Sequence, residues 1–130
     1  MAFNDPIAEL LTKIRNAKGA QHRYVDLSFS RIKVEILGIL KSHGFIENFL
    51  VNAEQYKVRV FLRYTKARES VINGLTRISK NGLRRYIGYA DIPRVFNGMG
   101  LAILSTPKGV LDGETARNLK VGGEILCTVW

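Results

Sequence analysis

The sequence predicts an α+β fold, in which a helix-strand-helix-strand-strand unit is followed by a mostly antiparallel β unit with one short helix. Apolar residues in the first third of the chain recur with the spacing of amphipathic helices, whereas residues 57–64 alternate between buried-type and mostly basic side chains. After residue 70 the apolar stretches are short and are separated by Asn-Gly turn signals. With 130 residues, 46% of them apolar, the chain can form one domain or two small ones around a real core.

Two amphipathic helices are predicted before residue 45. Asp5-Pro6 suits a helix start, because aspartate caps free N–H groups and proline fits the first helical position, and Gly19 can end that helix. A second helix is expected to begin at Ser30 and to close at Gly44. The apolar stripes would consist of Ile7, Leu10, Leu11 and Ile14 in the first helix and of Ile32, Ile36, Leu37 and Leu40 in the second.

Three strands complete the first predicted unit. Residues 24–27 form a short strand candidate, and residues 45–51 and 57–64 are expected to pair across a polar turn at residues 52–55. One face of the last strand would be buried and the other largely basic. The alternating sets are Val58, Val60, Leu62 and Tyr64 against Lys57, Arg59, Phe61 and Arg63.

The second predicted unit follows a polar segment at residues 65–70, so the domains are predicted at residues 1–65 and 66–130. Short strands are expected at residues 75–79, 84–90, 101–105 and 124–130, and a helix at residues 112–119. The turn signals are Asn81-Gly82 and Asn97-Gly98, and Gly122-Gly123 follows the helix.

Positive charge is concentrated in the middle of the chain. The formal net charge is +9, and residues 57–94 contribute ten basic and two acidic side chains, a net of +8. A block of one sign inside an otherwise balanced chain favours nucleic acid or an anionic membrane as a partner over an ordinary solvated surface. The basic residues are Lys57, Arg59, Arg63, Lys66, Arg68, Arg77, Lys80, Arg84, Arg85 and Arg94.

Several classes of protein are disfavoured. The single cysteine, Cys127, cannot form an internal disulfide, and with His22 and His43 far apart in sequence no metal-binding spacing appears. Asp5 and Glu9 stand where a signal peptide needs basic and apolar residues, and no window approaches the roughly 20 apolar residues of a membrane helix. We therefore expect a soluble protein of the cytosol, with no metal or other cofactor.

The segment LAILSTPKGV, residues 101–110, raises three chemical possibilities. Ser105 lacks the Gly-x-Ser-x-Gly surroundings of a hydrolase nucleophile, and the hydroxyls precede Lys108 and Gly109, the reverse of a phosphate-binding loop. Binding remains, because Ser105 and Thr106 can donate to or accept from base edges, ribose and phosphate, with Lys108 as a point charge. The alternative is that both hydroxyls cap the following turn.

Four blocks of the sequence together resemble the bacterial small-subunit ribosomal protein eight family. They are DPIAELLTKIRNA in the first helix and GLTRISKNGLRRY, IPRVFNGMGLAILSTPKGV and VGGEILCTVW in the second half. The resemblance covers essentially the whole chain and implies a two-part α+β fold without enzymatic activity. It also implies a place in the cytoplasmic ribosome, beside neighbouring small-subunit proteins. There, members bind a stem in the central domain of small-subunit rRNA during assembly, and some also bind their own mRNA.

The resemblance implies a set of RNA-binding residues. Ser105 and Thr106 match a strand-end Ser-Thr that contacts an irregular part of the stem, and Tyr86 and the loop Gly122-Gly123-Glu124 match positions that help to form that surface. The first-helix block with Thr12, Arg15 and Asn16 is expected to lie near the RNA backbone. Tyr86 can stack on a base, although a half-buried strand aromatic is the plain alternative. With the basic side chains that we expect to neutralise phosphates, the predicted set is Ser105, Thr106, Tyr86, Lys108, Gly122, Gly123, Glu124, Arg84, Arg85, Lys80, Thr12, Arg15 and Asn16.

Two residues differ from the family's usual pattern, and the role of a third has more than one interpretation. Pro107 stands where serine is usual and removes a backbone N–H from the loop. Asn81 stands where proline is usual, and we expect it to loosen a turn without removing a contact. Glu124 would orient a lysine or hydroxyl, or accept from a base, or be an ordinary surface glutamate.

Two rival functions make different predictions. An RNA-binding regulator that works off the ribosome would show weak selectivity among RNAs, and a hydrolase using Ser105 would react with serine-directed probes. A membrane-surface role is disfavoured, because neither amphipathic helix has a strongly basic polar face.

Overall fold

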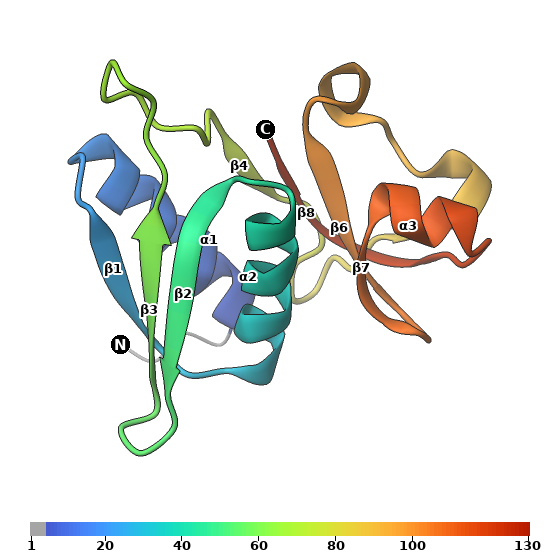
Figure 1. Ribbon diagram of the computed structural model, residues 1–130. Coiled ribbons are helices and arrows are strands. Elements are labelled where there is room, and N and C mark those ends of the chain that lie inside the picture. The colour runs from blue at the N-terminus through green and yellow to red at the C-terminus, as the bar shows by residue number, and fades with distance from the viewer. Residues whose placement is uncertain (1–4) are drawn as a thin grey trace. The chain divides into compact units, whose positions relative to one another are not determined.

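The computed structural model describes residues 5–130 and divides into two compact units, Met1–Asn73 and Gly74–Trp130. Each unit has its own sheet (Figure 1). Among the described residues, none of the helices combines the length and the apolar character needed to cross a bilayer.

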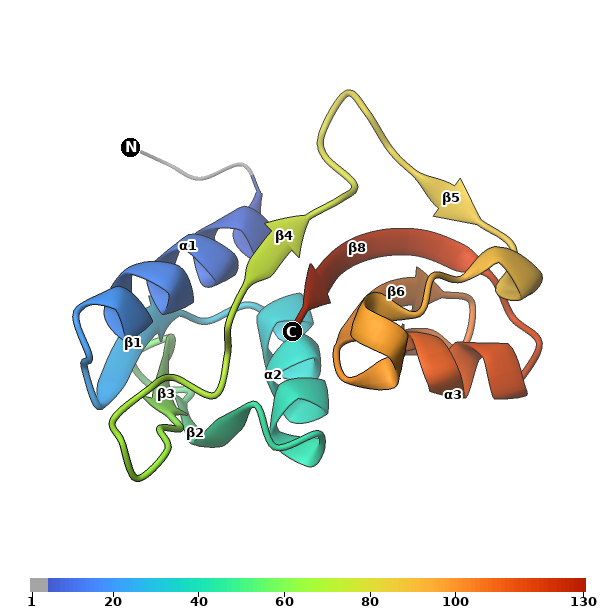
Figure 2. The same cartoon turned by 90° about the horizontal axis from the view of Figure 1, so that it is seen from above.

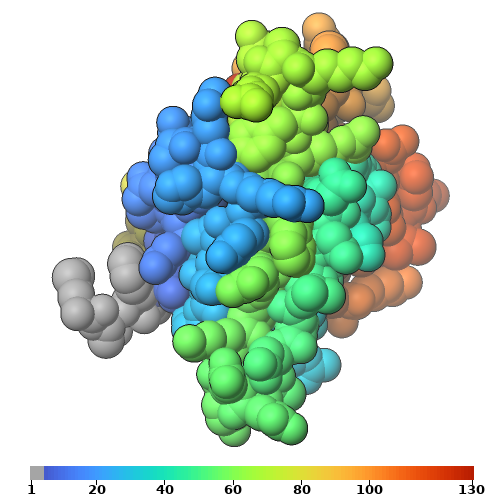
Figure 3. All heavy atoms as spheres, turned by 60° about the vertical axis from the view of Figure 1, so that its left-hand side comes forward, coloured from blue at the N-terminus to red at the C-terminus, as the bar shows by residue number. Residues whose placement is uncertain are grey.

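The first unit is a three-stranded antiparallel sheet with two helices on one face (Figures 1 and 2). Its elements confirm the predicted helix-strand-helix-strand-strand order, and the strands are arranged β1-β3-β2. They are α1 (Pro6–Gly19), β1 (Tyr24–Ser28), α2 (Arg31–Ser42), β2 (Ile46–Asn52) and β3 (Lys57–Leu62). The predicted alternation in β3 is confirmed, since Val58, Val60 and Leu62 are buried beneath the helices while Lys57 and Arg59 are exposed. Figure 3 shows the other face of this sheet, where side chains of β1, β3 and β2 lie at the surface.

The helix ends follow the sequence closely, with one exception. The Asp5 carboxylate accepts hydrogen bonds from the N–H groups of Ile7 and Ala8 at 3.1 and 3.2 Å, as a helix cap does. Gly44 adopts a left-handed φ of 77° after α2, as predicted from its position. Ser30 precedes α2 in extended conformation, but its side chain makes no capping hydrogen bond.

The buried stripe of α2 differs from the prediction at one position. Ile32 is only half-buried, and Lys33 takes its place in the interior next to Ile36 and Leu37. The Lys33 ammonium is accommodated there because Glu9 of α1 lies 2.7 Å away.

The first unit extends beyond residue 65. The Thr65 N–H donates to the Glu69 carbonyl at 2.8 Å, and the Val71 N–H donates to the Arg63 carbonyl at 3.0 Å. These bonds tie the polar segment back to the end of β3, so the division between the units falls after Asn73.

The second unit is an antiparallel sheet in the order β4-β8-β6-β7, with β5 paired to β8. The helix α3 packs on β6, with Ala116 buried against Ala102 and Leu104 in one apolar cluster. The elements are β4 (Leu75–Arg77), β5 (Tyr86–Ile87), β6 (Leu101–Thr106), β7 (Gly109–Asp112), α3 (Gly113–Asn118) and β8 (Gly123–Val129).

One strand prediction in this unit was wrong, and one strand was not predicted. The strand expected at residues 84–90 is reduced to β5, because its partner β8 begins at Gly123, opposite Ile87, and the strand pairing ends there. The next residues form a 3-10 turn at Tyr89–Asp91. The short strand β7 was not predicted. It follows β6 after a two-residue turn and pairs with it in antiparallel orientation.

Candidate nucleic-acid interface

The ends of three strands converge on Glu124 in the second unit. In the sheet register Glu124 of β8 lies opposite Ser105 of β6 on one side and opposite Tyr86 of β5 on the other. The Tyr86 side chain is 73% exposed. The sheet therefore brings a hydroxyl, a carboxylate and an open aromatic ring into one row across three strands.

The two glycines before Glu124 allow this convergence. A Cβ atom on Gly123 would lie 2.1 Å from the Ser105 carbonyl oxygen, and one on Gly122 would lie 2.4 Å from the Ile87 carbonyl oxygen. Both contacts are with backbone, so only glycine permits the start of β8 to come this close to its neighbours. The two glycines, which the sequence predicted as RNA-binding residues, therefore serve to place Glu124 beside its neighbouring strands, and they have no side chain with which to contact a ligand.

A hydrogen-bond network fixes the Glu124 carboxylate. Ser79, which is fully buried, donates its hydroxyl hydrogen to Oε2, and Arg84 Nη1 donates to the same oxygen at 2.8 Å. The Ser79 hydroxyl also accepts from the backbone N–H of Arg85 at 3.2 Å. Within residues 5–130, Glu124 Oε1 has no hydrogen-bond partner. Glu124 is therefore held in place with one oxygen left to accept from a ligand.

Asn81 adds to this network. Its side-chain oxygen accepts from Arg84 Nη2 at 2.8 Å, while Lys80 and Leu83 exchange two backbone hydrogen bonds of 3.0 Å across the turn. Asn81, which stands where proline is usual, therefore supplies an acceptor that orients Arg84. The sequence analysis did not predict this contact.

The network also shifts the titration of Glu124. Burial raises the pKa of Glu124, but hydrogen bonds from Ser79 and Arg84, together with the charges of Arg84 and Arg77, outweigh burial and hold the pKa below its ordinary value. The carboxylate thus favours the folded state when it is ionised.

We expect Glu124→Gln to flatten the acid limb of the stability curve. Because the pKa of Glu124 is lower in the folded than in the unfolded protein, its carboxylate stabilises the fold at pH values above the unfolded-state pKa, near 4.5. This stabilisation is lost as the pH falls through the folded-state pKa. Urea unfolding from neutral pH to about pH 3 measures this. Glu54→Gln, which changes an exposed carboxylate, is the matched control. An acid limb as steep in Glu124→Gln as in the parent chain would contradict the expectation.

The two hydroxyls of the Ser-Thr pair have different roles. Thr106 Oγ1 donates to the Gly109 carbonyl at 2.8 Å and accepts from the Lys108 N–H at 3.1 Å, so it caps the β6–β7 turn. The Ser105 hydroxyl makes no hydrogen bond to any residue in the described part of the chain, and it is half-exposed. Neither turn bond uses the backbone nitrogen of Pro107.

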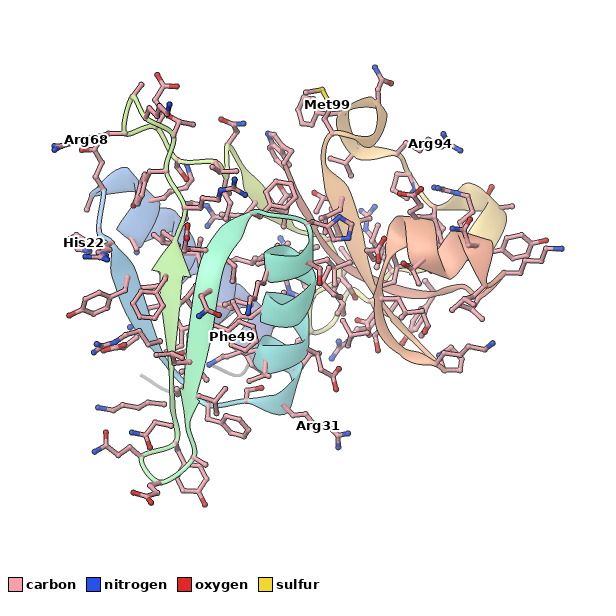
Figure 4. All side chains as sticks on the ribbon, viewed as in Figure 1. His22, Arg31, Phe49, Arg68, Arg94 and Met99 are labelled. Atoms are coloured by element: carbon pink, nitrogen blue, oxygen red, sulfur yellow. The ribbon has the colours of Figure 1, made fainter. Side chains whose placement is uncertain are left out.

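The basic block is divided between the two units. Lys57, Arg59, Arg63, Lys66 and Arg68 belong to the first, and Arg77, Lys80, Arg84, Arg85 and Arg94 belong to the second. Figure 4 labels one residue of each group, Arg68 and Arg94, with their side chains pointing into solvent. In the second unit Arg77 is turned inward and donates to the Leu126 carbonyl at 2.6 Å, whereas Lys80 and Arg85 are exposed.

The remaining predicted residues lie elsewhere. Thr12, Arg15 and Asn16 form an exposed stripe on α1, in the first unit, and so do not share the sheet that carries Glu124. Ser79 is the residue that the sequence did not reveal, since nothing in the pattern distinguishes a buried, bonded serine from a turn serine.

The described residues do not gather three or more His, Cys, Asp or Glu side chains in one place. Burial raises the pKa of the Cys127 thiol to about 12, so this cysteine is an interior residue without thiolate character.

Known proteins of one family have sequences similar to this chain. A family model described as "Ribosomal protein S8" matches residues 5–130. The "Small ribosomal subunit protein uS8" of Protochlamydia amoebophila is 50% identical, with complete coverage of both chains. The protein of the same name from Chlamydia trachomatis serovar D is 54% identical over 98% of this chain and 97% of its own. The chain therefore belongs to the ribosomal protein S8 family, and it is a structural, non-enzymatic component of the small ribosomal subunit.

Proposed function

We propose that the second unit binds an irregular stem in the central domain of the small-subunit rRNA and so helps the subunit to assemble in the cytoplasm. The surface for this binding, called here the Glu124 surface, is formed by Ser105, Thr106, Tyr86, Lys108, Glu124, Lys80, Arg84 and Arg85. One observation supports it most: Ser105 and Glu124, neighbours in register, each hold an unused hydrogen-bonding atom beside an exposed tyrosine.

The chemistry of this surface suits irregular RNA. The major groove of a regular A-form helix is too narrow for side chains, so sequence is recognised where bases leave the regular stack. Such bases offer amino groups and ribose hydroxyls to Glu124 Oε1 and Ser105, and they offer a face to the Tyr86 ring.

The basic side chains supply a second, less selective contribution. Lys80, Arg85 and Lys108 are exposed and can neutralise phosphates, which makes affinity fall as salt rises. Arg84 has a different role, because its guanidinium already bonds to Glu124 and Asn81. It orients the carboxylate and leaves phosphate contact mainly to its neighbours.

Ser105→Ala is expected to weaken binding to the stem by about 1–3 kcal/mol, because a polar RNA group would lose its partner in the interface. Binding to a perfectly paired duplex of equal length should hardly change. Titration of both RNAs at several salt concentrations measures the two effects. Ser42→Ala, which alters a hydroxyl bonded within α2, is the control. Equal losses for stem and duplex would contradict the proposed role of Ser105.

The same titration separates the remaining alternatives. A regulator that works off the ribosome would bind stem and duplex alike. Control of the chain's own synthesis requires an mRNA stem that presents the same irregular bases, and such a stem would show the same sensitivity to Ser105→Ala. Neighbouring small-subunit proteins complete the proposed set of partners.

A further inference from the structure

The open face of the first unit's sheet is a surface that the function above leaves unused. Both helices of that unit cover the opposite face (Figures 1 and 2). The open face, called here the outer face, is seen in Figure 3, and its residues pair in register in three cross-strand rows. They are Tyr24, Phe61 and Asn48; Asp26, Arg59 and Leu50; and Lys57 with Asn52, whereas Ser28, opposite Lys57 in register, directs its hydroxyl to Lys33 and Glu9 of the helices.

A guanidinium group and two aromatic rings, tilted by 55° to one another, lie together on the outer face. The Arg59 guanidinium lies 4.1 Å from the centroid of the Tyr24 ring, and the Phe61 ring centroid lies 6.1 Å from that of Tyr24. Asp26 fixes the guanidinium with two bonds, from Arg59 Nε at 2.8 Å and from Nη2 at 3.1 Å. Tyr24 remains 43% exposed. The side chains thus form an ordered platform of flat groups that is open to solvent.

A shallow hollow adjoins this platform. Its volume is about 780 Å³, and it runs over the β2–β3 hairpin between Asp26, Leu50, Asn52, Glu54, Lys57 and Arg59. Lys57 and Asn52, paired in register, bring a cation and an amide to its wall.

We propose that the outer face binds an unpaired nucleotide of RNA, at a site separate from the Glu124 surface. The base stacks on the Tyr24–Arg59 platform, Lys57 contacts the phosphate, and Asn52, whose Oδ1 accepts from the Gln55 N–H at 3.2 Å, donates from Nδ2 to the base edge or the ribose. Bases stack on aromatic rings and guanidinium planes alike, and such stacking tolerates different sequences.

RNA fits this face better than a protein does. The apolar part is small, and the Arg59–Asp26 ion pair interrupts it, so an apolar protein surface would have to bury that pair at a cost in desolvation. Arg59 is paired with Asp26, and Lys57 and Glu54 are the other charged residues at the hollow, so attraction of a phosphate would depend on Lys57 and not on the net charge of the face.

The test uses the full chain, labelled with ¹⁵N, and a short oligoadenylate that forms no stem. Amide shifts should move at Tyr24, Arg59 and Leu50 as the oligoadenylate is added. Tyr24→Ala should weaken this binding by about tenfold, the scale of one lost base stack, and Tyr24→Phe should retain it. Thermal melting shows that each variant is folded.

Two controls separate the outer face from general attraction and from the stem site. Arg31→Ala removes the same charge as Arg59→Ala, from the exposed start of α2, and should leave the outer-face shifts intact (Figure 4). Ser105→Ala should spare oligoadenylate binding at the outer face, just as Tyr24→Ala should spare binding of the isolated stem.

Three outcomes would overturn the proposal. The first is that oligoadenylate leaves the outer-face amides unmoved. The second is that Arg31→Ala weakens their response as much as Arg59→Ala does. In the third, the amides move only when other small-subunit proteins are added, and the outer face is then a protein interface.

Discussion

Lys33→Ala is expected to lower the free energy of unfolding by about 3–5 kcal/mol, the range found when one partner of a buried ion pair is removed. The Lys33 side chain is 1% exposed, and its ammonium has three donors. All three have acceptors: Glu9 Oε2 at 2.7 Å, Ser28 Oγ at 2.8 Å and the Ser28 carbonyl at 3.1 Å. Alanine would leave a largely buried carboxylate without its cation and a cavity beside it.

The position of Lys33 explains why the expected loss is so large. Its ammonium joins α2 to α1 through Glu9 and to β1 through Ser28, so three elements depend on one group. Urea unfolding followed by circular dichroism gives the change in free energy. Lys41→Ala, in the last turn of the same helix and exposed, is expected to stay within about 0.5 kcal/mol.

A double substitution distinguishes charge from packing. Lys33→Met with Glu9→Met removes both charges while keeping apolar volume, and it should recover most of the stability lost in Lys33→Ala. A loss in Lys33→Ala no larger than that of the Lys41 control would show that the pair contributes nothing to the first unit.

Lys33 also marks the limit of what the sequence could predict about the first unit. Helix positions, the Asp5 cap and the alternation of β3 follow from local spacing, and all three are confirmed. A lysine beside an apolar stripe is ordinarily a surface residue. Its burial depends on Glu9, 24 residues earlier in the chain, and no local pattern reports that pairing.

The Glu124 surface shows the same limit in the second unit. The sequence indicated the Ser-Thr pair and Tyr86 by their chemistry, but only the register of β5, β6 and β8 sets them around Glu124. Burial of Ser79 and the hydrogen bond from Arg84 to Asn81 likewise depend on contacts between strands and turns. Residue types could be predicted, whereas the division between bonded and unbonded hydroxyls could not.

Gly123→Ala is expected to destabilise the protein by about 3 kcal/mol or more, the upper end for overpacking a rigid site. The added Cβ would lie 2.1 Å from the Ser105 carbonyl oxygen and 3.0 Å from the Thr106 Cα atom. These are backbone atoms of β6, so no side-chain rotation relieves the clash. The strands β6 and β8 must move apart where Ser105 faces Glu124.

Gly88→Ala is the matched control, since no atom lies within 4 Å of its added Cβ and its φ is −76°. It should leave stability within about 1 kcal/mol, on the stabilising side if anything, because alanine restricts the unfolded chain. Thermal and urea unfolding of both variants give the difference.

Stem binding adds a second measurement for Gly123→Ala. Under conditions where the variant is still folded, separation of Ser105 from Glu124 should lower affinity for the irregular stem at least as much as Ser105→Ala does, by about 1–3 kcal/mol. Binding to a regular duplex depends on exposed basic side chains and should persist. If Gly123→Ala lost stability but bound the stem normally, the close approach of the two strands would serve folding alone, and recognition would have to reside away from Glu124.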